Sequence, residues 1–121
     1  TKSNVRVFVG NDQLVLPGLA LGAVGCVSGN ANVMPGAFVS LFDAWSSGNV
    51  EEARRLQALV TRVARKLKDG GHLALFKLAL TMQGVPVGAT RNPLPQAQKA
   101  DEADVRDVLR LIEETTTVVD V

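Results

Sequence analysis

Two short runs of mainly apolar residues near the start of the chain precede several segments with helical periodicity. Val5–Val9 is rich in β-branched residues and is followed by a Gly-Asn-Asp turn, which predicts a strand. Its apolar residues fall on both sides, as in a parallel-sheet strand covered on both faces. Gly25–Ser28 predicts a second, shorter strand. A helix that begins at Asp12 or Pro17 and ends near Gly22 joins them into a right-handed βαβ unit.

From residue 35 onward the apolar positions recur at helical steps. Pro35–Ser47 predicts a helix, because proline is favoured in the first turn. Asn49 is expected to cap the next helix, with Glu52 three residues later as in a capping box. That helix carries one apolar stripe and ends at Gly70–Gly71. His72–Gln83 predicts a third helix that is apolar nearly all round, so we expect it to be buried.

The remaining third of the chain predicts a loop, a helix and a frayed end. Val85–Ala100 contains three prolines and predicts an ordered loop. Asp101 or Asp104 begins a last helix with one apolar face, and Thr115–Val121 has no helical pattern. Two buried-type strands cannot cover their own edges. We therefore interpret the strands as the end of a larger parallel sheet, whose preceding part is missing or lies in another chain.

Composition narrows the class of protein. The 121 residues are 46% hydrophobic and 21% charged with a net charge of +1, which suits one folded domain and disfavours disorder. The basic residues between Arg54 and Lys68 are interpreted as a solvated helix face, so no nucleic-acid partner is expected. The single cysteine, Cys26, predicts a reducing, cytoplasmic location. We expect no membrane partner, because neither an unbroken apolar span nor a signal peptide is found.

Several pieces of the sequence, in their order and spacing, carry a resemblance. They are Val9-Gly10-Asn11-Asp12, Leu21 to Ser28, Asn32-Val33-Met34-Pro35, Gly48-Asn49 followed by Ala53, Lys77 before Gly84, and Arg91-Asn92-Pro93-Leu94. Together they resemble the C-terminal part of the dihydrodipicolinate synthase and N-acetylneuraminate lyase family of aldolases. The resemblance covers roughly residues 5–114.

The resemblance implies an α/β fold, the C-terminal portion of a (β/α)8 TIM barrel. Residues 1–48 would be its last two β/α units and residues 49–121 a C-terminal helical extension. Such a barrel usually needs about 250 residues, so this chain would be less than half of one. Members of the family commonly form tetramers, and a homo-oligomer is therefore expected.

The resemblance also implies a lyase that forms a Schiff base between a lysine and pyruvate or a related 2-oxo acid. That lysine, on the sixth strand of the family, would lie upstream of Thr1, so no catalytic residue is expected in this chain and the chain alone would be inactive. The N-terminal part of the same barrel would be its partner. We expect no cofactor and no metal.

By the same resemblance, this chain would supply one wall of the substrate pocket. The expected substrate-binding residues are Gly10, Asn11, Asp12, Gln13, Val27 and Ser28. Gly10 has no Cβ and lets a substrate approach the backbone, while the carbonyl of Val27 would lie near the lysine. The polar side chains of Asn11 and Gln13 favour a hydroxylated substrate.

Four single residues allow two interpretations each. Asp12 can bind substrate or cap a helix, and both can hold. Lys77 can act as an imine-forming amine, but a lysine on an apolar helix more often extends to solvent or pairs with a carboxylate. Cys26 is interpreted as a small buried residue rather than a reactive thiol. His72 has no second ligand at metal spacing, and we expect it exposed at a helix start.

Two alternative functions stay open at this level. The chain can be a non-catalytic module whose helices bind a partner, or a catalytically inactive relative of the family.

Overall fold

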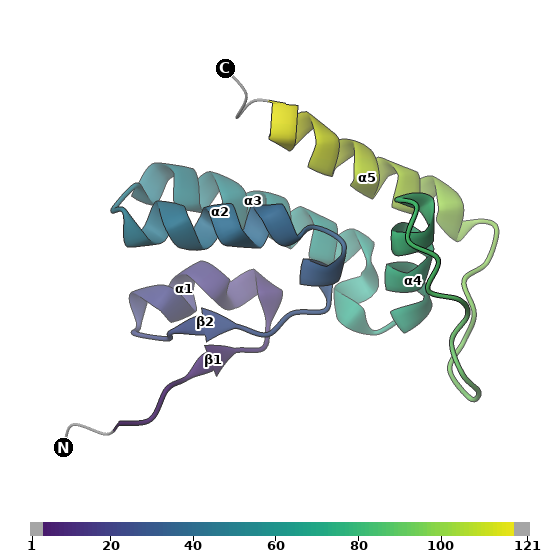
Figure 1. Cartoon of the computed structure of the whole chain (residues 1–121), viewed down its shortest axis with the longest axis horizontal. Helices are drawn as coiled ribbons and strands as arrows, with labels where there is room; N and C mark the ends of the chain where they lie inside the picture. The colour runs from purple at the N-terminus through teal and green to yellow at the C-terminus, as the bar shows by residue number, and fades with distance from the viewer. Residues whose placement is uncertain (1–3, 118–121) are drawn as a thin grey trace.

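The computed structural model describes residues 4–117, and a parallel βαβ unit stands at its N-terminal side (Figure 1). Strand β1 (Phe8–Val9) pairs in parallel with β2 (Gly25–Cys26). The connection consists of a 3-10 turn, η1 (Asp12–Leu14), that runs directly into helix α1 (Val15–Ala20). The predicted strand–helix–strand unit is therefore confirmed.

The strands are shorter and less covered than the pattern predicted. The first strand was expected over Val5–Val9, but the ladder includes only Phe8–Val9, because a single parallel neighbour pairs with it within residues 4–117. The side chains of Val7, Phe8 and Val27 are 57%, 56% and 72% exposed. Coverage of both faces is thus not supplied by the described part of the chain.

Helices form most of the rest of the described chain. They are η2 (Asn30–Asn32), α2 (Pro35–Ser46), α3 (Val50–Lys66), η3 (Lys68–Gly70), α4 (Leu73–Met82) and α5 (Asp101–Thr117). Pro35 opens α2 and Asn49 caps α3, whose Glu52 N–H donates to Asn49 Oδ1 at 3.2 Å. Only this half of the capping box forms, because the Glu52 carboxylate pairs with Arg55 instead. The segment 85–100 is a loop, as predicted.

The C-terminal prediction was wrong in part. Helix α5 continues through Thr117, so Thr115–Thr117 are helical rather than frayed. The side-chain hydroxyl of Thr115 donates to the Leu111 carbonyl at 2.9 Å, which ties it into the preceding turn. The expectation for Val118–Val121 lies outside the described residues.

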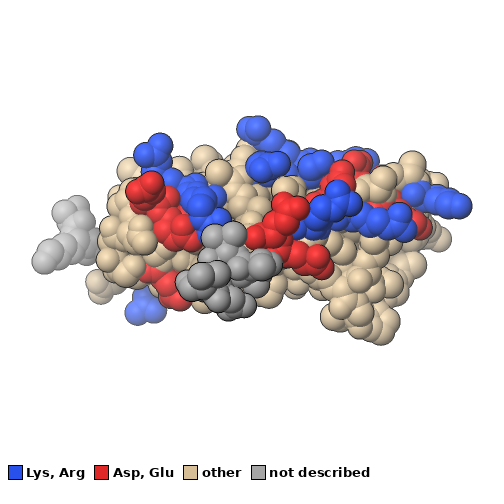
Figure 2. All heavy atoms as spheres, turned by 90° about the horizontal axis from the view of Figure 1, so that it is seen from above, with Lys and Arg blue, Asp and Glu red and all other residues tan. Residues whose placement is uncertain are grey.

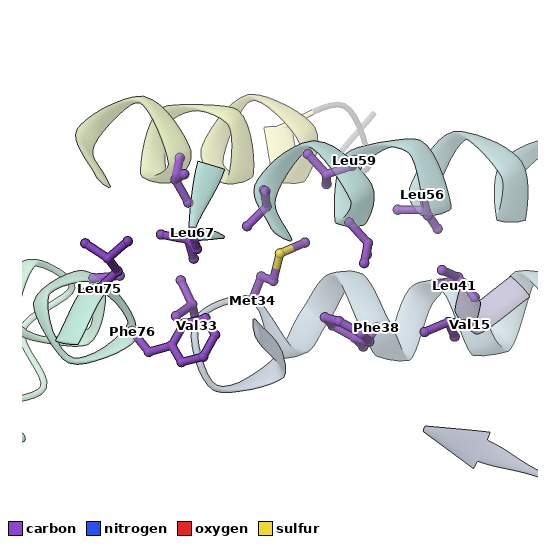
Figure 3. Close-up of a cluster of buried hydrophobic side chains, with 14 of the residues drawn as sticks. Val15, Val33, Met34, Phe38, Leu41, Leu56, Leu59, Leu67, Leu75 and Phe76 are labelled. Carbon is purple, nitrogen blue, oxygen red and sulfur yellow. The ribbon is translucent and has the colours of Figure 1, made fainter. Parts of the chain in front are cut away.

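One hydrophobic core joins the helices. Helices α2 and α3 pack side by side, with α1 between them and the small sheet (Figure 1). Leu41 of α2 and Val60 of α3 are fully buried, and the core extends from Val15 of α1 to Val108 of α5. Figure 3 shows part of this core, with Leu41 of α2 beside Val15 of α1. The core thus spans both sides of residue 48, and the boundary proposed there stays a prediction. No helix within residues 4–117 has the length and apolarity needed to cross a bilayer.

Helix α4 is buried on one face rather than all round. Its inward residues Ala74, Leu75 and Ala79 are at most 4% exposed, whereas Leu73 is 44% exposed. The expectation of all-round burial was wrong because the described neighbours of this helix, chiefly α5 and η2, leave part of its surface uncovered. An apolar sequence indicates what a helix can bury, but the neighbours decide which faces are covered.

Candidate functional site

The carboxyl ends of the two parallel strands open onto a cavity of about 550 Å³. Residues of the β1–α1 turn line one side of it, and residues that follow β2 and α3 line the others. The residues with the most chemical character in its wall are Gly10, Asn11, Asp12, Gln13, Asn30 and Asp69. Ligands of parallel α/β folds bind at this end of the strands, so the cavity is the candidate site.

The turn after β1 is shaped by Asn11. Its side-chain oxygen accepts a hydrogen bond from the Gln13 backbone N–H at 3.0 Å and caps η1. Asn11 therefore does the capping that was one interpretation of Asp12, and the Asp12 carboxylate is left for a different contact. Gly10 faces open space where a side chain would begin, since a methyl group placed on its Cα would meet no atom within 4 Å.

Asp12 contacts the segment after the second strand. Asn30 Nδ2 donates to Asp12 Oδ2 at 2.6 Å, which joins the ends of β1 and β2. Asn30 is 2% exposed, and neither Asp12 Oδ1 nor Asn30 Oδ1 has a hydrogen-bond partner among the described residues. The sequence patterns did not indicate Asn30 as a site residue. Its place two residues after Ser28 was the available signal.

The helical part of the chain also reaches the cavity. Gln13 Nε2 donates to Asp69 Oδ1 at 2.7 Å, although 56 residues separate them. Asp69 lies in η3, where Lys68 and Asp69 have φ values of 56° and 51°. This left-handed backbone turns the chain after α3 toward the strand ends, and non-glycine residues adopt it at a cost. Nothing in the local sequence indicated Asp69.

Two of the expected site residues do not line the cavity. Val27 is 72% exposed, and its backbone N–H donates to the Val9 carbonyl at 2.9 Å. The Ser28 hydroxyl oxygen accepts a hydrogen bond from the backbone N–H of Ala31 in η2 at 3.1 Å. The structure brings together the four residues from Gly10 to Gln13 and leaves Val27 and Ser28 outside this wall. Their roles in substrate binding stay predictions.

The electrostatic character of the site is acidic. Asp12 and Asp69 are the charged residues in the described wall, and neither Lys, Arg nor His lines it. Burial raises the pKa of the Cys26 thiol above its ordinary value, and the nearby Asp12 charge raises it further. Both effects disfavour the thiolate, so Cys26 is a protonated, partly buried side chain rather than a nucleophile.

Lys77 and His72 lie away from the strand ends. Lys77 Nζ donates to the Val87 carbonyl at 3.2 Å, so the lysine holds the 85–100 loop rather than a carboxylate. His72 precedes α4 as expected, but it is half-buried and its Nδ1 has no partner among the described residues. Within residues 4–117 no group of three potential ligand side chains is placed to hold a metal ion.

The basic residues of α3 form a mixed surface. Figure 2 shows lysine and arginine side chains in a band along the molecule with carboxylates interspersed. Lys66 Nζ lies 4.0 Å from Asp107 Oδ2, and Lys68 Nζ lies 3.9 Å from Asp101 Oδ1. Basic groups of α3 and of the following turn therefore face acidic groups of α5. This arrangement agrees with a solvated helix face.

Comparison with known proteins defines the class. The fold matches part of solved TIM-barrel lyases: the wild-type sialic acid aldolase of Ruminococcus gnavus superposes with a TM-score of 0.88 and 25% identity, over 97% of this chain and 40% of the aldolase. DapA-2, a dihydrodipicolinate synthase of Bacillus anthracis, gives a TM-score of 0.83 and 30% identity, over 91% of this chain and 38% of the synthase.

Sequence comparison identifies the particular family. Residues 1–112 match the dihydrodipicolinate synthetase family, and the chain belongs to it. An N-acetylneuraminate lyase of Rhizobium meliloti (strain 1021) is 38% identical over 85% of this chain and 34% of the lyase. A 4-hydroxy-tetrahydrodipicolinate synthase of Methanothrix thermoacetophila is 37% identical over 93% of this chain and 38% of the synthase. The chain thus spans little more than a third of the length of these relatives.

Proposed function

We propose that this chain is the C-terminal part of a lyase that forms a Schiff base with pyruvate or a related 2-oxo acid. The observation that carries the proposal is the cavity at the carboxyl ends of two parallel strands, lined by Gly10, Asn11, Asp12 and Gln13. Active sites of (β/α)8 barrels lie at this end. The match to lyases over about a third of their length supports the same assignment.

The preceding part of the barrel is the proposed partner. Val7, Phe8 and Val27 expose apolar side chains in and beside the two-stranded sheet, and a third parallel strand with its helices would cover them. The solved aldolase matches 97% of this chain with only 40% of its own length. This match supports the proposal that a preceding part of the barrel completes the sheet.

The proposed chemistry uses an amine from the preceding part. A lysine amine adds to the 2-oxo carbonyl and water leaves, which gives an imine that withdraws electrons from the neighbouring carbon. The wall described here would hold the part of the substrate distant from the imine. Lys77 is an unsuitable amine because it lies on α4, outside the strand-end cavity, and donates to the Val87 carbonyl.

Trapping with borohydride tests the proposal. The intact protein that contains this chain, treated with pyruvate and sodium borohydride, should gain a stable mass increase on one lysine outside residues 1–121. A Lys77→Arg variant serves as the control and should be trapped equally well. The absence of an adduct, or an adduct on Lys77, would contradict the proposal.

A further inference from the structure

We propose that Asp69–Gly70 is a site of spontaneous covalent modification, at which the Asp69 side chain becomes part of the main chain as isoaspartate. The sequence has seven aspartates, and Asp69 is the one that a glycine follows. It lies in η3, the turn that leads from α3 toward α4 and reaches the strand-end cavity. The inference does not depend on the reaction that the intact protein performs.

The reaction needs only these two residues and water. The backbone nitrogen of Gly70 attacks Cγ of the protonated Asp69 carboxyl, a nitrogen–carbon bond forms, and the carboxyl hydroxyl leaves with the amide proton as water. Water then opens the five-membered imide at either carbonyl carbon. Opening at the former backbone carbonyl leaves the main chain running through Cγ, so the mass is unchanged and the main chain gains one methylene. Glycine favours the first step because it has no Cβ to shield its nitrogen.

The local structure leaves this dipeptide accessible to water and strained. Asp69 and Gly70 are exposed. Lys68, Asp69 and Gly70 have φ values of 56°, 51° and 78°, so three consecutive residues have a left-handed backbone. Two of the three carry a Cβ and adopt this conformation at a cost. A strained, exposed turn belongs to the parts of a protein that open locally at a low free energy.

Two hydrogen bonds hold the closed turn in an unreactive geometry. With ψ of Asp69 at 32°, the Gly70 nitrogen lies nearly opposite the Asp69 Cβ across the Cα–C bond, and the ring cannot close without a rotation about that bond. The rotation separates Gly71 N–H from the Lys68 carbonyl, now at 2.8 Å. It also draws the Asp69 carboxyl away from Gln13 Nε2, which donates to Oδ1 at 2.7 Å. The modification rate therefore follows the fraction of molecules in which η3 is open.

The product changes the candidate site from its helical side. The added methylene lengthens the main chain in η3, and the free carboxylate of isoaspartate branches directly from Cα, one bond closer to the main chain than before. It therefore falls short of Gln13 in the same turn. Asp69 and Gly70 both line the cavity, so the modification alters the wall and loosens the contact between the end of α3 and the strand ends.

Peptide mapping of the intact protein that contains this chain tests the inference. After prolonged incubation at mildly acidic pH, isoaspartate should accumulate at position 69 faster than at the other six aspartates of the chain. A protein isoaspartyl methyltransferase, which methylates the new carboxylate, detects it. Asp69→Glu is the control and should stay unmodified, because its longer side chain would have to close a larger ring. Isoaspartate at position 69 that does not exceed the level at the other aspartates would overturn the inference.

A second comparison tests the role of Gln13. Gln13→Ala should raise the rate at position 69 about five-fold, the increase in the open fraction expected when one hydrogen bond is lost. Hydrogen exchange of Gly71 N–H should rise by the same factor, because its bond to Lys68 closes the turn. Gln98→Ala is the matched control, since this exposed glutamine makes only a 3.4 Å contact within its own loop, and it should change neither rate. An unchanged rate in Gln13→Ala would overturn the protective role of Gln13.

Asp69→Asn keeps the inference testable if the Gln13 variant does not fold. Asparagine tolerates a left-handed backbone as aspartate does, and its side-chain oxygen can still accept from Gln13. The same ring then forms with loss of ammonia in place of water, and mass spectrometry detects the acid that results. Position 69 should lose its amide faster than Asn11 and Asn32, which are exposed asparagines followed by aspartate and valine. Equal losses at the three positions would overturn the inference.

Discussion

The side-chain amide of Gln57 donates a hydrogen bond to the backbone carbonyl of Asp12 at 2.9 Å, across 45 residues of sequence. The carbonyl oxygen of the same side chain accepts from Leu16 N at 2.8 Å. One glutamine of α3 therefore satisfies an acceptor and a donor at the start of the segment that lines the cavity. The position of the β1–α1 turn therefore depends on α3, which lies more than 30 residues further along the chain.

This contact predicts a loss of stability in Gln57→Ala. The substitution leaves the Asp12 carbonyl and the Leu16 N–H without their partner, which should lower the free energy of unfolding by about 1–3 kcal/mol. Urea denaturation measures the loss. Gln98→Ala removes an exposed glutamine whose amide makes only a 3.4 Å contact, and it should stay within about 0.5 kcal/mol of the wild type. Equal losses in the two variants would contradict the assigned role of Gln57.

A second prediction concerns the packing of α1 on β1. A Cβ added at Gly18 would overlap the side-chain methyl Cγ2 of Val9. Gly18→Ala should therefore lower the free energy of unfolding by about 1–3 kcal/mol, because a β-branched side chain cannot move away without backbone shifts. Gly36→Ala is the control on α2, where the added methyl meets nothing within 4 Å.

The control should change stability in the opposite direction. Alanine at position 36 reduces the conformational freedom of the unfolded chain and should stabilise the protein by about 0.5–1 kcal/mol. Thermal and urea denaturation of both variants give the comparison. A Gly18→Ala protein as stable as Gly36→Ala would show that α1 does not rest on Val9 as described.

Cys26 gives a prediction for alkaline pH. Burial, and then the charge of Asp12, raises the pKa of the Cys26 thiol in the folded state. The unfolded thiol therefore loses its proton first, and the free energy of unfolding should fall as pH rises above the ordinary thiol pKa. Iodoacetamide labelling checks this, since the folded protein should react more slowly than a urea-unfolded sample at the same pH. Equal rates would contradict the raised pKa.

The free energy of unfolding should also depend on the protonation of Glu52 at acid pH. The hydrogen bond from Arg55 lowers the pKa of the Glu52 carboxyl. The contribution of the pair is present above the ordinary glutamate pKa and is lost as pH falls through the lowered value. Because both side chains are partly exposed, Arg55→Gln should cost only about 0.5 kcal/mol at neutral pH and nothing once the pH has fallen below the lowered pKa of the Glu52 carboxyl.

The comparison for this pair is Arg54→Gln. Arg54 is exposed on the same helix and forms no ion pair among the described residues. At neutral pH, Arg54→Gln should lower the free energy of unfolding by less than Arg55→Gln does. The difference between the two variants should vanish in acid. A difference that persists after the Glu52 carboxyl is protonated would show that Arg55 acts through packing rather than through Glu52.

Local signals in the sequence were sufficient for most elements. The proline at position 35 and the cap at Asn49 set the starts of α2 and α3, because each acts within one helical turn. The turn after β1 was also correctly located, and the residues from Gly10 to Gln13 do line the cavity. Their spacing in the sequence is short, so the local backbone alone brings them together.

The errors have a common physical origin in contacts between distant segments. The apolar pattern of α4 predicted all-round burial, but Leu73 is 44% exposed in the described structure. Asn30 and Asp69 were missed because their polar partners, Asp12 and Gln13, lie 18 and 56 residues earlier. No periodicity or spacing rule encodes a hydrogen bond across such separations.

The sequence by itself determined the order of the elements, the family and one wall of the cavity, since apolar periodicity and helix caps act over a few residues. Only the tertiary structure decided which side chains complete that wall. Asn30 and Asp69 become site residues because the packing of α3 against α1 and α2 brings η3 to the carboxyl ends of the strands. The acidic charge and the unpaired acceptor atoms of the cavity result from this contact between η3 and the strand ends. The contact depends on the packing of the whole core rather than on any local segment.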